Sequence, residues 1–104
     1  MLLGRVTGTV VASRKDEGLS GQKLLVVRNL TVDGGDASGF VVAVDGVGAG
    51  EGDVVLYATG SSARQTIATK DRPCDAVVMA IVDSWDVGGE TVYRKTPADG
   101  EWAS

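Results

Sequence analysis

A glycine cluster between two apolar runs is the feature that most constrains how this chain can fold. Between the runs at residues 42–44 and 54–58, glycine occupies every second position, at 46, 48, 50 and 52. If this backbone were extended, the glycines would leave one side bare, so that another backbone could lie against it. The second run is β-branched and aromatic, which favours a strand. The segment therefore predicts two strands joined by a glycine-rich connection that serves as a contact surface.

The composition indicates a small barrel. The chain has 104 residues, enough for one domain with a single core. Apolar residues make up 43% of it, but aromatic residues only 5%, and there are 15 glycines. The core must therefore be built from Val, Leu, Ile and Ala on thin, closely spaced strands.

Apolar and β-branched runs predict six strands. They cover, in chain order, residues 2–12, 23–30, 40–44, 54–58, 76–83 and 91–95. The run at 76–83 is the longest and should be a central strand. The run at 24–27 is continuous, which fits a strand covered on both faces, one of them by a neighbouring subunit. Turns are predicted at residues 33–36 and 84–90, where paired glycines can adopt positive φ.

The remaining segments predict a loop, one short helix and a tail. Residues 13–22 are polar and should form a surface loop. Ser61 follows Gly60 and can cap a helix of one to two turns. We expect one barrel domain over residues 1–95 and a weakly ordered tail over 96–104.

Charge, cysteine content and hydropathy exclude several classes. The net charge of −4 argues against a surface that binds nucleic acid, because such surfaces are cationic. Cys74 is the only cysteine, so an intrachain disulfide is impossible and a reducing compartment is expected. The first residues lack the pattern of a secretory signal, and no apolar run is long enough to span a membrane. We expect a soluble cytoplasmic chain without a membrane partner.

The residues predict no catalytic, cofactor or metal site. There is no histidine, which removes the usual general base and the commonest metal ligand. The glycine cluster leads into a strand and is flanked by acidic residues, unlike a phosphate-binding loop. Ser61 and Ser62 have no base to activate them, and Cys74 should be inert. Arg64 is suited to a bidentate pair with Asp45 or Glu51, of this chain or a neighbour; the alternative is a solvated surface arginine.

Several separated stretches resemble one family. They are residues 1–12, Arg14-Lys15, Leu19, Gly21, residues 23–27, the Ala-Val-Asp-Gly-Val-Gly-Ala-Gly segment at 43–50, Gly60-Ser61-Ser62-Ala63-Arg64, residues 75–78 and 81–83. Together they resemble the pentameric vertex proteins of bacterial microcompartment shells, the EutN/CcmL family. The resemblance reaches Lys95, and the segments 43–50 and 60–64 are its most specific parts.

The resemblance implies a mainly β protein: a small closed barrel, similar in outline to an oligonucleotide-binding fold, with one short helix. It implies a cyclic homopentamer that caps the vertices of a microcompartment shell in the bacterial cytoplasm, beside hexameric and trimeric shell proteins. The implied role is structural, with no enzyme activity. Small residues suit a close seam between subunits. The predicted interface residues are Asp45, Val47, Gly48, Ala49, Gly50, Gly60, Ser61, Ser62, Ala63 and Arg64.

Two alternatives are weighed against this interpretation. A barrel that binds nucleic acid or a nucleotide would need exposed aromatic residues and a cationic groove, and this acidic chain has only five aromatic residues, Phe40, Tyr57, Trp85, Tyr93 and Trp102. A non-catalytic subunit of an enzyme that shares the barrel is the other alternative, because a fold alone does not define a function.

Overall fold

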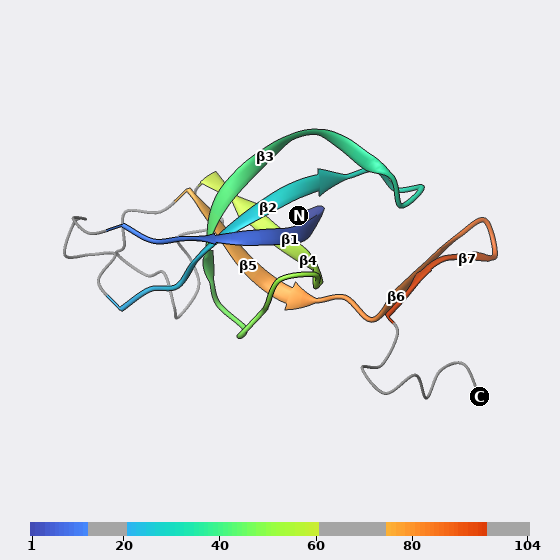
Figure 1. Cartoon of the computed structure of the whole chain (residues 1–104). Helices are drawn as coiled ribbons and strands as arrows, with labels where there is room; N and C mark the ends of the chain where they lie inside the picture. Colours follow the sequence, from blue (N-terminus) through green and yellow to red (C-terminus); the bar gives the residue numbers. More distant parts are fainter. Residues whose placement is uncertain (13–20, 61–74, 96–104) are drawn as a thin grey trace.

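Seven strands make up the regular structure of the part of the chain that the structure describes. The computed structural model describes residues 1–12, 21–60 and 75–95. In these ranges the strands are β1 (Leu2–Val10), β2 (Leu24–Leu30), β3 (Asp36–Asp45), β4 (Val54–Thr59), β5 (Ala76–Ile81), β6 (Ser84–Val87) and β7 (Glu90–Arg94). Figure 1 shows the first five wrapped around one another, with β6 and β7 projecting to one side.

The first five strands close into a barrel in the order β1-β2-β3-β5-β4. Neighbours pair antiparallel, except for β3 and β5, which run parallel. The parallel contact is short and joins Val44 to Val77 and Asp45 to Val78. The predicted closed barrel is confirmed. Since every strand of a closed barrel has two neighbours, β5 is no more central than the other four.

The barrel core consists mainly of small side chains. Its buried members are Val6, Leu25, Val27, Ala43, Ala49, Val55, Tyr57, Ala76 and Val78. On β2 and β5 they occupy every second position, as the pleat of a sheet requires. Some residues between them are buried as well, and Val44, Ala58 and Val77 form a second cluster. Tyr57 is the largest fully buried side chain, and its hydroxyl donates a hydrogen bond to Asn29 Oδ1. The composition therefore predicted the character of the core correctly.

The segment after β5 differs from the prediction. Residues 84–90 were expected to form only a turn, but Ser84–Val87 is a strand that pairs with β7 in a separate two-stranded sheet. Trp85 and Tyr93 lie opposite each other and stack, with ring centroids 5.2 Å apart. Trp85 also donates from Nε1 to Val32 O at 2.8 Å, which anchors this hairpin to the β2–β3 turn. The indole contact across 53 residues stabilises what would be a marginal isolated hairpin.

Strand boundaries differ modestly elsewhere. β3 begins at Asp36, four residues earlier than predicted, because its first part continues to pair with β2 as far as Leu30. β5 ends at Ile81, two residues early. The predicted surface loop lies mostly, and the predicted helix and tail wholly, outside the described residues.

The packing of the core leaves no room for a side chain at Gly4. A Cβ there would clash with Val27 Cγ1 and lie 2.9 Å from Arg28 O. We expect Gly4→Ala to lower the free energy of unfolding by about 1–3 kcal/mol, since overpacking forces neighbours to shift. Gly8→Ala, on the same strand, is the control, because a Cβ there would meet nothing within 4 Å. Urea denaturation of both variants tests this, and equal stability would contradict it.

Burial of Tyr57 predicts how stability depends on alkaline pH. Desolvation raises the pKa of the Tyr57 phenol above its ordinary value of 10.0. The unfolded chain then releases this proton at lower pH than the folded chain does, so stability falls as the pH rises above that value. We expect Tyr57→Phe to lose less stability than the unsubstituted protein between neutral pH and about pH 11. Parallel slopes of unfolding free energy against pH would contradict this.

Candidate functional site

The glycine loop, residues 46–52, connects β3 to β4 and packs against the barrel core through Ala49. Its residue Ala49 has no exposed surface and belongs to the barrel core. The side chain of Val47, by contrast, is 41% exposed. The loop therefore places Ala49 in the core and leaves other residues, such as Val47, exposed.

The carboxylate of Asp45 organises the first half of this loop. Its Oδ1 accepts hydrogen bonds from the backbone N–H groups of Val47, Gly48 and Ala49, at 3.0, 2.9 and 3.1 Å. The side chain of Asp45 is only 4% exposed. Hydrogen bonds to a charged acceptor are stronger than neutral ones, so this one side chain holds the loop in a defined shape.

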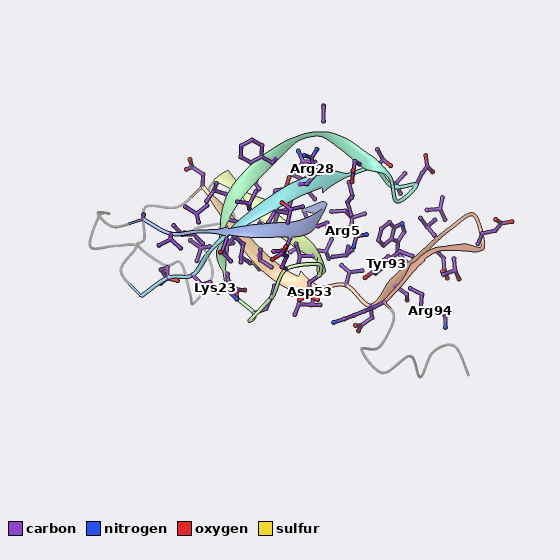
Figure 2. The ribbon with its side chains drawn as sticks, in the orientation of Figure 1. Arg5, Lys23, Arg28, Asp53, Tyr93 and Arg94 are labelled. Atoms are coloured by element: carbon purple, nitrogen blue, oxygen red, sulfur yellow. The ribbon has the colours of Figure 1, made fainter. Side chains whose placement is uncertain are left out.

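Lys23 completes the arrangement from β2's side of the barrel. Its Nζ donates to Ala49 O at 2.8 Å and lies 3.8 Å from Asp45 Oδ2. The ammonium therefore contacts both the loop backbone and the carboxylate that shapes it. Figure 2 shows Lys23 at the end of the barrel where the loop lies.

Asp53 fastens the second half of the loop. Its Oδ2 accepts from the N–H of Gly50 at 2.8 Å, and its Oδ1 lies 3.6 Å from Lys95 Nζ. Arg5 Nη1 donates to Gly52 O at 3.2 Å. Contacts from β1 and from the residue that follows β7 thus converge on one short loop.

The glycines do not form the extended backbone with one bare side that their alternate spacing suggested. Gly48 and Gly52 have φ of 79° and 93°, so they form turns rather than an extended bare edge. Gly46 does lie against another stretch of backbone, but this is strand β5 of the same chain. A Cβ on Gly46 would be 2.7 Å from Val78 O. Glycine is needed here for turns and for close packing within the chain.

The predicted interface residues lie in different environments, and Gly50 among them is half-buried with its N–H bonded to Asp53 Oδ2. Val47 and Gly48 are exposed on the loop, whereas Ala49 is buried and Asp45 is almost fully so. Gly60 is exposed with φ of 62° and donates to Asp75 O at 2.9 Å. Ser61, Ser62, Ala63 and Arg64 lie outside the described residues, so the pairing predicted for Arg64 remains a prediction. Within this chain, the Asp45 carboxylate already interacts with Lys23 and accepts hydrogen bonds from backbone N–H groups of the loop.

Two residues that shape the loop were missed at the level of sequence. Lys23 is 22 positions from Asp45, and only the pairing of β2 with β3 brings them together. Asp53 stands out in the sequence only as one of the acidic residues that flank the glycine cluster. An aspartate directly before or after a glycine-rich turn commonly accepts from nearby backbone N–H groups, and this was the available signal.

The described residues contain no cluster of metal-ligating side chains. Within residues 1–12, 21–60 and 75–95, no group of three or more potential ligands could hold a metal ion. In the same ranges, no helix is long and apolar enough to cross a membrane.

The chain matches one family model over most of its length. The model described as ethanolamine utilisation protein EutN/carboxysome matches residues 1–83. The carboxysome shell vertex protein CcmL of Gloeobacter violaceus is 42% identical over 95 residues, which span 91% of this chain and 95% of that protein. The bacterial microcompartment shell vertex protein GrpN of Rhodospirillum rubrum is 49% identical over 84 residues, spanning 81% and 94%.

Solved structures agree with this match. The structure of Gloeobacter violaceus CcmL aligns with a TM-score of 0.87 over 91% of this chain and 98% of that one, at 42% identity. The GrpN pentameric microcompartment shell protein from Rhodospirillum rubrum aligns with a TM-score of 0.78 over 84% and 99%, at 47% identity.

Removing the carboxylate of Asp45 should destabilise the loop. Asp45→Ala leaves three backbone N–H groups without their acceptor, and we expect a loss of about 2–4 kcal/mol in the free energy of unfolding. Asp45→Asn keeps one acceptor oxygen and should lose less. Asp86→Ala is the control, because Asp86 is exposed on the hairpin and makes no interaction within the described residues. Urea denaturation at one protein concentration measures all three, and equal losses for the alanine variants would contradict the role of Asp45.

Proposed function

The chain belongs to the EutN/CcmL family, and we propose that five copies of it form a ring that caps a vertex of a bacterial microcompartment shell. The observation that carries this proposal is the alignment of the barrel with a pentameric shell protein over 84% of the chain at 47% identity. The relatives named above are shell vertex proteins from carboxysomes and other microcompartments. The function is structural, not enzymatic.

The shape of a closed shell explains why such a ring is useful. A flat layer of hexagonal tiles cannot close on itself. Units of five inserted among them introduce curvature and seal the vertices. A ring of five arises when one patch of each subunit contacts a different patch of the next and the rotation closes.

The exposed part of the glycine loop is proposed as one of these patches. Val47 and Gly48 are exposed there, and the hydrogen bonds to Asp45 hold them in place. A preorganised loop loses little conformational entropy when a second subunit contacts it, which favours assembly. Gly60 and residues 61–64 are proposed to extend the same patch, with Arg64 contacting a carboxylate of a neighbouring copy.

The proposal extends to partners and location. The ring would lie among hexameric and trimeric shell proteins, in a microcompartment shell within the bacterial cytoplasm. It would need no cofactor and no metal, because its contribution is a shape and a set of contacts.

Native mass spectrometry of the purified chain tests the ring directly. We expect one dominant species with the mass of five chains, which persists on dilution to low micromolar concentration. Co-expression with a hexagonal shell protein should then give closed particles in electron micrographs, and extended sheets or tubes when this chain is left out. A monomer at every concentration, or particles that close equally well without the chain, would overturn the proposed function.

A further inference from the structure

The outer wall, which we define as Val26, Arg28, Phe40 and Val42, is a side of the barrel that this chain leaves open. These residues form two adjacent cross-strand pairs, Val26 with Val42 and Arg28 with Phe40. The residues between them, Val27 and Val41, face the core. Phe40 is 64% exposed and Val42 is 44% exposed. An apolar patch of this kind on a sheet is typical of a surface that contacts a partner.

Arg28 is the charged member of the outer wall, and it has no partner among the described residues. Its neighbour across β1 is Arg5, so two cationic residues face each other on adjacent strands. Like charges in this position destabilise a sheet. Arg5 is directed to Gly52 O, whereas Arg28 is exposed beside Phe40. A carboxylate from outside the chain would satisfy the guanidinium and offset this repulsion.

The glycine loop offers such a carboxylate. Glu51 is exposed and makes no interaction within the described residues. Four residues before it, Val47 presents an exposed apolar side chain. The loop thus carries one apolar and one anionic group, where the outer wall carries apolar groups and one cation.

Strand β1 lies between the two surfaces: Arg5 on β1 pairs with Arg28 of the outer wall, and its Nη1 donates to Gly52 O at the end of the loop. In Figure 1, β3 arches over the upper side, and the connection from β3 to β4 runs along the lower side. Within one chain Glu51 and Arg28 form no ion pair although both are exposed, so each can contact the next subunit. Two different patches on one subunit are what a head-to-tail ring requires.

We propose that the outer wall binds the glycine loop of a second copy of this chain. In this seam Phe40 and Val42 cover Val47, and Arg28 pairs with Glu51. The proposal rests on the proposed ring and names its second patch. The partner is a second copy because one chain carries both complementary surfaces and because Asp45 already holds the loop in a fixed shape.

Charge reversal tests the pair. We expect Arg28→Glu and Glu51→Arg each to raise the concentration at which the ring half-dissociates by about ten-fold or more, because each places like charges together in the seam. The double variant, which restores an opposite pair, should recover most of the loss. Native mass spectrometry over a dilution series measures this for all three variants.

Glu90→Arg provides the matched control. Glu90 is also exposed and without an interaction in the described part of the chain, but it lies on the hairpin. Combined with Arg28→Glu, it should not restore assembly. The proposed seam would be overturned by single variants that assemble like the unsubstituted protein, or by a double variant that assembles no better than the single variants. Neither result would contradict the ring itself. If the unsubstituted chain is itself a monomer, the proposed function fails instead.

Cross-linking gives a second readout that does not depend on the strength of the ion pair. Val42→Cys and Val47→Cys are made separately in a Cys74→Ser background, and a short bis-maleimide is added. A mixture of the two chains should give cross-linked dimers, and neither chain alone should give them. Dimers from Val42→Cys alone would mean that two outer walls face each other, and no dimers from the mixture would mean that wall and loop are apart. Either result overturns the proposal.

Discussion

The Asp45 carboxylate, with its three backbone hydrogen bonds, is the interaction on which the glycine loop depends. Glycines that permit tight turns also raise the entropy of an unfolded loop, so their loop needs an internal anchor to keep one shape. Asp45 supplies that anchor from the end of β3, and Lys23 supports it from the residue before β2. Ala49 then enters the core, and the loop becomes part of the barrel rather than an appendage.

The barrel itself is held by close packing of small residues. Strands built from Val and Ala approach closely, and Gly4 allows β1 to lie against Val27 and Tyr57 without a side chain between them. The hairpin of β6 and β7 is outside this core and outside the residues that the family model matches, and Trp85 connects it to the β2–β3 turn.

A shell protein needs surfaces that fit rather than groups that react. This accounts for a chain without histidine, and for charged residues engaged with the backbone, such as Lys23 and Arg5. The charged residues that remain without partners in the described ranges, such as Arg28 and Glu51, are then available to neighbouring copies. In a repeated assembly each such contact occurs once per subunit, so modest pair energies add to a stable ring.

The sequence by itself determined the barrel and the family. Runs of β-branched residues define strands locally, and the segments at 43–50 and 60–64 are specific enough to be matched without coordinates. It did not determine β6, because Ser84–Val87 has too few apolar residues to predict a strand until Tyr93 and Val32 contact Trp85. Nor did it indicate that Ala49 is buried, that Lys23 reaches the loop, or that Arg28 and Phe40 share one open face. Those facts follow from strand register and barrel closure, which bring together residues far apart in the chain, and only the tertiary structure decides them.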